Sequence, residues 1–201
     1  MQGRISQTSN LILDLRNNGG GYVVALERLA GYFVDKDTKI ADLKGRKAMK
    51  PQTAKTRGKD VFNGKLIVLI DANSGSAAEI FARFVQIEQR GVVIGDQSAG
   101  AVMQSVSVPM QMGGDSIVAY GMSLTNADVI MTDGKSLEHI GVTPQLALKP
   151  VGADIARSAM SFYPPRWNFS DKKLRLKQPE NFFHLNGKTT KAIRKKFSEP
   201  L

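Results

Sequence analysis

Three short apolar runs mark the chain, at residues 11–15, 65–72 and 91–95. Each is rich in Val, Ile and Leu without polar alternation, which is typical of strands covered on both faces in a parallel sheet. Between them, residues 22–33 and 77–89 repeat apolar side chains at the spacing of amphipathic helices. This alternation of strands and helices predicts an α/β fold built from stacked βαβ units.

Residues 39–59 interrupt the alternation. They carry eight Lys or Arg against one Asp, together with Gly and Pro, which predicts an exposed, mobile connection or an irregular hairpin. Further along, residues 104–108 and 116–130 alternate between apolar and polar positions, with Gly113 and Gly114 between them. Alternating runs on either side of two glycines are typical of a β-hairpin.

The composition of the 201 residues is that of a folded globular protein, with 42% hydrophobic and 23% charged side chains. No uninterrupted apolar run reaches the length of about 18 residues that indicates a membrane-spanning helix, so membrane insertion is not expected. The absence of cysteine excludes disulfides, thiolate nucleophiles and cysteine-bound metals. His, Asp and Glu show no metal-ligand spacing, so neither a metal nor another cofactor is expected.

The basic excess, +10 overall, is concentrated at the C-terminal end. Residues 151–201 carry 11 basic and 4 acidic side chains, and the apolar periodicity ends before them. We therefore expect a core over residues 1–150 and a basic C-terminal extension over residues 151–201. The extension has neither zinc-ligand spacing nor an aromatic RNA-binding signature, so nucleic acid is not an expected partner.

The first candidate for chemistry is Ser76, in the segment DANSGSAAEI of residues 71–80. It lies where an apolar strand turns into an amphipathic helix, so free backbone N–H groups and the positive end of the helix dipole converge there. Such N–H groups stabilise the oxyanion that forms when a serine attacks a carbonyl. Glu79 follows three residues later, so the same pattern also fits a capping box without a catalytic role.

The second candidate is the run of Gly19, Gly20 and Gly21 after the first predicted strand. A glycine loop presents backbone N–H groups that can bind an anion or form half of an oxyanion hole. No nucleotide-binding motif accompanies these glycines, which argues against a nucleotide phosphate site. A tight turn that needs a positive φ is the alternative explanation.

Four segments in order make the sequence recognisable: LILDLRNNGGG, KLIVLIDANSGSAAEIFA, GVVIGDQSAGA and LEHIGVTPQ. Over residues 10–150 the chain resembles the S41 peptidases, which comprise the tail-specific or carboxy-terminal processing proteases and their tricorn-like relatives. The resemblance implies a ClpP/crotonase-like α/β core in which Ser76 is the acylated nucleophile. It also implies an oxyanion hole formed by the N–H of Ala77 and one N–H of Gly20 or Gly21.

The general base is where the chain departs from this family. In the processing branch a lysine takes the proton from serine, but the matching position holds Ala101, which cannot accept a proton. The tricorn-like branch uses a histidine upstream of the glycine loop together with a glutamate, and Glu138 matches that glutamate. Because the chain begins about ten residues before the loop, we expect an N-terminally truncated core. It would be the C-terminal part of a longer protease whose missing part carries the base.

His139, next to Glu138, is the alternative base within the chain. Adjacent side chains on a strand point to opposite faces, so a strand here would keep Glu138 and His139 from serving one site. The second histidine, His184, lies in the basic extension and is interpreted as a packed or surface residue.

The resemblance implies a serine endopeptidase that cleaves protein or peptide substrates through an acyl-enzyme on Ser76, in the cell envelope, periplasm or extracellular space. Ala101 supports an alternative, a catalytically inactive S41-fold protein that binds peptides. A third hypothesis, a crotonase-like enzyme acting on a thioester, shares the fold but does not need the segment around Ser76. The sequence leaves the oligomeric state open.

Overall fold

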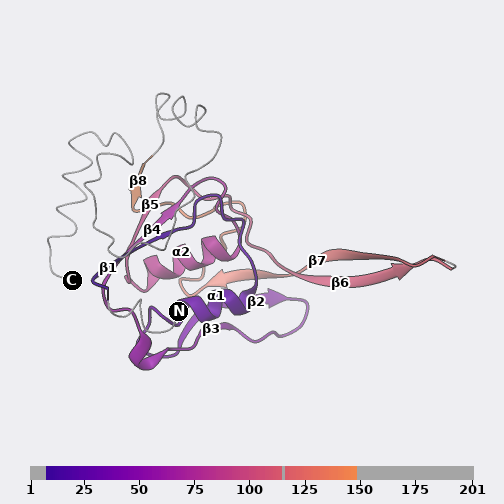
Figure 1. Cartoon of the computed structure of the whole chain (residues 1–201), viewed down its shortest axis with the longest axis horizontal. Helices are drawn as coiled ribbons and strands as arrows, with labels where there is room; N and C mark the ends of the chain where they lie inside the picture. The colour runs from indigo at the N-terminus through magenta and orange to yellow at the C-terminus, as the bar shows by residue number, and fades with distance from the viewer. Residues whose placement is uncertain (1–7, 115, 149–201) are drawn as a thin grey trace. The chain divides into compact units, whose positions relative to one another are not determined.

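The computed structural model describes residues 8–114 and 116–148 of the chain (Figure 1). The predicted basic extension over residues 151–201 lies outside the described residues. Within them the chain forms two four-stranded sheets and two α-helices. In chain order the elements are β1 (Asn10–Asp14), α1 (Val23–Ala30), β2 (Thr38–Gly45), β3 (Gln52–Ala54), a 3₁₀-helix η1 (Gly58–Asp60), β4 (Lys65–Ile70), α2 (Ala77–Ile87), β5 (Val92–Gly95), β6 (Gln104–Met112), β7 (Val118–Met131) and β8 (Leu146–Ala147).

The first sheet is parallel and has the strand order β1-β4-β5-β8. Its central strands β4 and β5 are joined by α2, which makes a βαβ unit. Leu66, Val68 and Ile70 of β4 are buried, as expected of a strand covered by packed elements. The predicted α/β class is therefore confirmed.

Burial on both faces is a wrong prediction for β1. This strand lies at the edge of the parallel sheet, beside β4, and Ile12 in it is 46% exposed. Large aliphatic side chains dominate the apolar run at residues 11–15, as they do the central strands β4 and β5. The burial of a strand depends on which strands and helices pack against it. A short apolar run does not show whether its strand is central or at the edge of the sheet.

The second sheet is antiparallel and has the order β3-β2-β7-β6. Its strands β2 and β3 form an antiparallel hairpin over the basic segment, with an irregular register between Lys39 and Ala41. Of the two predicted forms, the irregular hairpin is confirmed and the exposed, mobile connection is wrong. Ile40, Ala41 and Ala54 are completely buried in this hairpin. The few apolar positions decide the pairing, because most of the basic side chains between them face solvent.

Helix α2 contacts β5 of the first sheet and β7 of the second, and so joins the two sheets (Figure 1). Its apolar stripe is buried, as predicted, and both helices are a few residues shorter than their periodic segments. Phe33 packs edge-to-face against Phe81 and Phe62, with ring centroids 5.5 Å and 6.0 Å apart. Such contacts add to the area that the aromatic rings bury.

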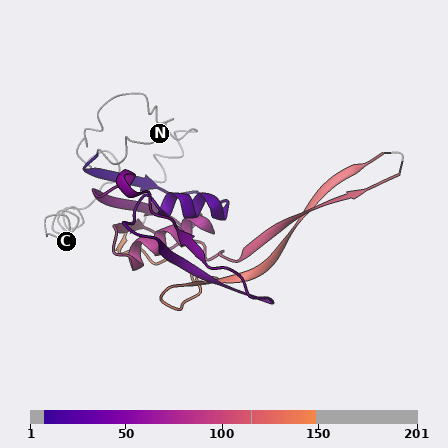
Figure 2. The ribbon, with the colours of Figure 1, turned by 90° about the horizontal axis from the view of Figure 1, so that it is seen from below.

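Strand β6 and the first half of β7 form a two-stranded ribbon that extends away from the rest of the described core (Figures 1 and 2). We call this ribbon, residues 104–112 and 118–125, the arm. None of its residues is buried. The predicted hairpin around Gly113 and Gly114 is confirmed. Strand β6 is longer than the alternating segment 104–108 indicated, whereas β7 nearly coincides with the segment 116–130.

Candidate active site

Ser76 lies at the turn between β4 and α2, directly before the first helical residue, Ala77. Its backbone has φ 51° and ψ −121°, a conformation that residues other than glycine rarely adopt and that costs about 1–3 kcal/mol. The capping box with Glu79 is also present, and capping leaves room for a further role of the serine. A serine on a sharp, strained strand-to-helix turn is the geometry of an exposed hydrolase nucleophile.

The glycine loop lies directly against Ser76. Gly20 has φ 102°, and a Cβ built on it would lie 2.6 Å from Ser76 Cβ and 2.9 Å from the Ala77 nitrogen. Glycine fits there because it has no Cβ and tolerates a positive φ. A Cβ on Gly19 or Gly21 would meet nothing within 4 Å, so the close approach is made by Gly20.

Two backbone N–H groups near Ser76, those of Ala77 and Gly21, donate no hydrogen bond within the part of the chain that the structure describes. The N–H of Gly20, in contrast, donates to Asn18 Oδ1 at 2.9 Å. The sequence leaves Gly20 and Gly21 as equal candidates. In the structure Gly20 provides the close packing, and the N–H of Gly21 stays available to a ligand.

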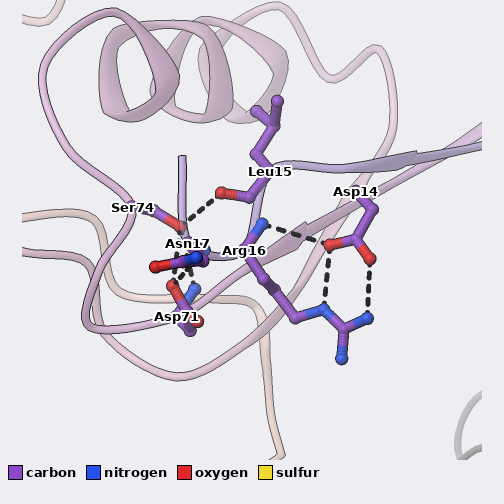
Figure 3. Close-up of polar contacts among 6 residues, drawn as sticks. All are labelled: Asp14, Leu15, Arg16, Asn17, Asp71 and Ser74. Atoms are coloured by element: carbon purple, nitrogen blue, oxygen red, sulfur yellow. Dashed lines mark hydrogen bonds and ion pairs between the residues drawn. The ribbon is translucent and has the colours of Figure 1, made fainter. Parts of the chain in front are cut away.

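A cluster of polar contacts anchors the start of the glycine loop to the loop that follows β4 (Figure 3). Asp71 Oδ1 accepts a hydrogen bond from the N–H of Asn17 at 3.0 Å. Ser74 Oγ lies 2.8 Å from the Leu15 carbonyl oxygen and 3.2 Å from Asp71 Oδ1. The contacts of Asp71 with Asn17 and of Ser74 with Leu15 join residues more than fifty positions apart in the chain, a pairing that sequence reasoning does not identify.

An ion pair holds the end of β1, just before the glycine loop (Figure 3). Arg16 Nη2 lies 2.6 Å from Asp14 Oδ2, and Arg16 Nε lies 2.8 Å from Asp14 Oδ1. Burial acts to raise the pKa of Asp14, but the hydrogen bonds and charge of Arg16 outweigh it and hold that pKa below its usual value. The Asp14 carboxylate in turn raises the pKa of Arg16.

Glu79, in the first turn of α2, is completely buried. Its Oε2 accepts hydrogen bonds from the N–H groups of Ser76 at 2.9 Å and Ala101 at 3.0 Å. Its Oε1 accepts from Ser98 Oγ at 2.6 Å and the N–H of Gly100 at 2.7 Å. One carboxylate therefore ties Ser76 to the GDQSAGA segment. The capping-box spacing predicts the bond to Ser76, whereas the bonds to residues 98–101 are signalled only by an acidic residue on the apolar face of a helix.

Glu138 and His139 lie in a turn, not on a strand, so the strand-based reason for separating them is wrong. His139 has φ 61°, and its Nε2 lies 3.9 Å from Glu138 Oε1. Its side chain is 91% exposed. Glu138 Oε2 accepts hydrogen bonds from the N–H groups of Val102 at 2.6 Å and Met103 at 3.1 Å. The carboxylate is therefore linked to the segment beside Ser76, whereas the imidazole faces solvent.

Ala101 is adjacent to Ser76. Its carbonyl oxygen accepts a hydrogen bond from the N–H of Ser76 at 2.9 Å. A lysine at this position would therefore begin next to the serine. No histidine or lysine side chain hydrogen-bonds to Ser76 within residues 8–114 and 116–148.

A pocket of about 90 Å³ opens beside Ser76 and Ala77. Its buried polar member is Gln52 of β3, only 2% exposed, whose Nε2 donates to Gln104 Oε1 at 3.3 Å. Gln52 Oε1 has no hydrogen-bond partner among the described residues. The apolar lining comes from both helices, from β7 and from the segment before β6, with Val23, Leu26, Ile80, Val129 and Val102.

An α/β core with a strained serine between a strand and a helix, packed against a glycine loop, is the architecture of a serine-type hydrolase. The sequence model described as Peptidase family S41 matches residues 1–148. The chain belongs to this family.

Relatives and solved structures agree with this assignment. The chain is 31% identical over 139 residues to the carboxy-terminal-processing protease of Bartonella bacilliformis, an alignment that covers 69% of this chain and 30% of the relative. It is similar to the structure of the photosystem II D1 C-terminal processing protease, with a TM-score of 0.57 and 26% identity over 71% of this chain and 35% of the other. The structure of mature CPAF shares the fold, with a TM-score of 0.63 and 18% identity over 78% and 42% of the two chains.

The chain spans less than a third of the length of the curated relatives that it matches first. In the part that the structure describes, no helix has the length and apolar character needed to cross a bilayer.

Proposed function

We propose that the protein containing this chain is a serine-type endopeptidase that cleaves protein or peptide substrates through an acyl-enzyme on Ser76. The observation that carries the proposal is the strained backbone of Ser76 beside two N–H groups without acceptors in the described residues. Family membership supports the reaction type, since the curated relatives named above are processing proteases. Cleavage near the C-terminus of a protein substrate is the specific form that these relatives suggest.

In the proposed reaction Ser76 Oγ attacks the scissile carbonyl carbon while its proton passes to a general base. The carbonyl oxygen becomes an oxyanion that accepts hydrogen bonds from the N–H groups of Ala77 and Gly21. Collapse of this intermediate breaks the C–N bond, and the leaving amine takes the proton from the base. Water then attacks the acyl-enzyme by the same steps and releases the second product with Ser76 regenerated.

The general base is proposed to lie outside this chain, as a histidine supplied by another part of the protein. Glu138 would orient that histidine, since its carboxylate lies at the segment that continues from Ala101. His139 is the alternative base, but its 91% exposed side chain would have to turn toward Ser76.

The substrate is proposed to bind in extended form along β6, which is an edge strand of the second sheet. Edge strands present backbone groups that pair with an added peptide strand. Gln104 and Ser105 of β6 line the pocket beside Ser76, so a peptide paired there would place one side chain in the pocket.

Location and domain organisation remain predictions. Family resemblance suggests the cell envelope, the periplasm or the extracellular space. A core over residues 1–150 followed by a basic extension over 151–201 is the proposed division of this chain.

The second candidate function is a catalytically inactive protein of this fold that binds peptides. Ala101 favours it, because the position beside Ser76 holds no proton acceptor. Loss of an essential base lowers peptidase activity by several orders of magnitude.

A peptidase assay on the full-length gene product separates the two functions. Ser76→Ala is compared with Ser123→Ala, which removes an exposed serine of β7 outside the pocket. The protease proposal predicts loss of activity by at least about a thousandfold in Ser76→Ala and near-normal activity in Ser123→Ala. Activity that survives Ser76→Ala would refute the acyl-enzyme on Ser76. A folded wild type that binds peptides without cleaving them would establish the inactive alternative.

A further inference from the structure

The loop that joins β2 and β3 carries a group of exposed cations. Arg46, Lys47 and Lys50 are all exposed, and none of them forms an ion pair with another residue in the described part of the chain. We call these three residues the loop cations. Like charges that lie this close together raise the local positive potential, which attracts anionic groups.

The acidic side chains at the other end of the same hairpin already have partners. Asp42 lies 2.8 Å from the Lys39 ammonium, and Asp37 lies 2.7 Å from the Lys55 ammonium. Each of these carboxylates neutralises a lysine of its own. The charge of the loop cations is therefore left without a matching carboxylate among the described residues of the hairpin.

The loop is folded back on the end of β2. Lys44 and Ala48 form an isolated antiparallel bridge. Met49 is half-buried, and its Sδ lies 3.1 Å from the position that a Cβ on Gly45 would occupy. A loop that is held by its own backbone and by a packed side chain loses less conformational entropy when a ligand binds to it.

Both ends of the loop lie close to the pocket of the candidate site. At its start, Gly45 pairs with Ala127, and Ala127 pairs with Gln104, which lines the pocket. Two strand spacings, about 10 Å, therefore separate the backbone of Gly45 from this wall. At its end, Gln52 also lines the pocket and follows Lys50 by two residues, which span at most about 7 Å. The loop cations therefore lie next to the pocket.

The pocket itself is neutral. No charged side chain is among the described residues that line it, and its buried polar member is the amide of Gln52. A carboxylate inside this pocket would lose its hydration without gaining a cation, which is unfavourable. An acidic group of a bound peptide is therefore favoured outside the pocket, on the side where the loop cations lie.

We propose that the loop cations bind the side-chain carboxylates of Asp or Glu in a peptide substrate whose neutral part occupies the pocket. This inference rests on the proposed function, because the pocket adjoins Ser76. Lys and Arg form charge-assisted hydrogen bonds with carboxylates, and the planar guanidinium of Arg46 suits a bidentate contact. The favoured substrate is a peptide with a neutral residue at the pocket and acidic residues near it.

The test measures peptide binding to the full-length gene product carrying Ser76→Ala, which prevents cleavage during the measurement. Fluorescence anisotropy compares two short labelled probes with blocked ends, one alternating Glu with Ala and the other alternating Gln with Ala. The loop variant replaces all three loop cations with Gln. The control variant, Arg28→Gln with Lys36→Gln and Lys59→Gln, removes the same charge from exposed positions outside the loop.

The protein with an unchanged loop is expected to bind the Glu probe at least about tenfold more tightly than the Gln probe. The control variant is expected to keep this preference, and the loop variant to lose most of it. A preference that is absent from the unchanged protein, or that survives in the loop variant, would overturn the proposal. Equal losses in both variants would also overturn it, because the net charge of the molecule would then decide the binding.

Binding to phosphatidylglycerol vesicles tests a lipid headgroup as the partner instead. The proposal is overturned if the loop variant loses vesicle binding and keeps its preference for the Glu probe. Circular dichroism checks that both variants are folded.

Labelling of Ser76 by a fluorophosphonate separates this inference from the proposed function. In the wild-type protein the Glu probe is expected to slow the labelling more than the Gln probe does, because it occupies the adjoining pocket more tightly. Equal slowing by the two probes would mean that acidic peptides bind elsewhere and would contradict the inference. A wild-type protein that is not labelled at all would contradict the nucleophile, and the anisotropy comparison would still decide whether the loop cations bind acidic peptides.

Discussion

Glu79 shows how much of the site depends on one buried side chain. A carboxylate without exposure to water is stable only when hydrogen bonds replace its hydration. Three N–H groups and one hydroxyl fill that role here, and they come from the start of α2 and from residues 98–101. These bonds hold the N–H of Ser76 in place and enforce the unusual backbone conformation of the serine.

Glu79→Gln tests this role. The amide replaces one acceptor oxygen with a donor that faces N–H or O–H groups, so bonds to a charged acceptor worth about 1.5–3 kcal/mol each are lost. We expect the free energy of unfolding to fall by about 2–3 kcal/mol in urea denaturation. Glu88→Gln, an exposed position at the other end of the same helix, is the control and is expected to change stability by less than about 0.5 kcal/mol. Equal effects in the two variants would show that the hydrogen bonds of Glu79 do not supply this stability.

Gly20 is the residue through which the glycine loop touches Ser76. Gly20→Ala places a methyl group 2.6 Å from Ser76 Cβ at a φ of 102°, so the loop or the serine has to move. We expect the rate of labelling of Ser76 by a fluorophosphonate to fall at least about tenfold, the effect of about 1.4 kcal/mol. Gly19→Ala, where a Cβ meets nothing within 4 Å, is expected to label at nearly the wild-type rate. Similar rates in both variants would show that the loop does not contribute to the reactive geometry.

At the level of elements, apolar periodicity predicts the strands and helices. The predicted burial of β1 on both faces and the predicted mobile connection at residues 39–59 are wrong for physical reasons. β1 and β4 have similar composition, yet one is an edge strand and the other is central. The basic segment around β2 and β3 pairs as a hairpin because Ile40, Ala41 and Ala54 are buried. Charge counts describe the exposed positions of a strand and say little about the buried ones.

The packing of α2 against the turn after β7 includes an ion pair whose effect depends on pH. Arg83 Nη2 lies 2.5 Å from Asp133 Oδ2. Burial acts to raise the pKa of Asp133, but the hydrogen bond from Arg83 outweighs it, and the pKa of Asp133 is lowered. A carboxyl group whose pKa is lower in the folded state stabilises the protein above its unfolded pKa of about 3.9. This stabilisation is lost as the pH falls through the folded value.

Asp133→Asn removes that contribution. At neutral pH the variant is expected to unfold with a free energy lower by at most about 1 kcal/mol, because the pair is partly exposed and screened by solvent. As the pH falls below about 3.9 the difference is expected to shrink, because Asp133 becomes protonated first in the unfolded state and then in the folded state. Urea denaturation across this pH range measures it. A difference that stays constant with pH would show that the pair does not supply the stabilisation.

At the scale of the whole molecule, the site combines four segments that are distant in the chain. The loop after β1, the turn before α2, residues 98–103 and Glu138 are brought together by the parallel sheet and by side-chain bonds such as those of Asp71 and Glu79. The sequence identifies Ser76, Ala77 and the glycine loop because they belong to contiguous motifs. It does not predict which glycine N–H stays free, because that depends on the hydrogen bond from Gly20 to Asn18.

The central claim is that Ser76 is an activated nucleophile, and intact-mass analysis of the full-length protein after incubation with a fluorophosphonate tests it most directly. Wild type, Ser76→Ala and Ser123→Ala are treated side by side. We predict one phosphonyl adduct on the wild type and on Ser123→Ala, and none on Ser76→Ala. An adduct that persists in Ser76→Ala, or a folded wild-type protein that acquires none, would contradict the claim.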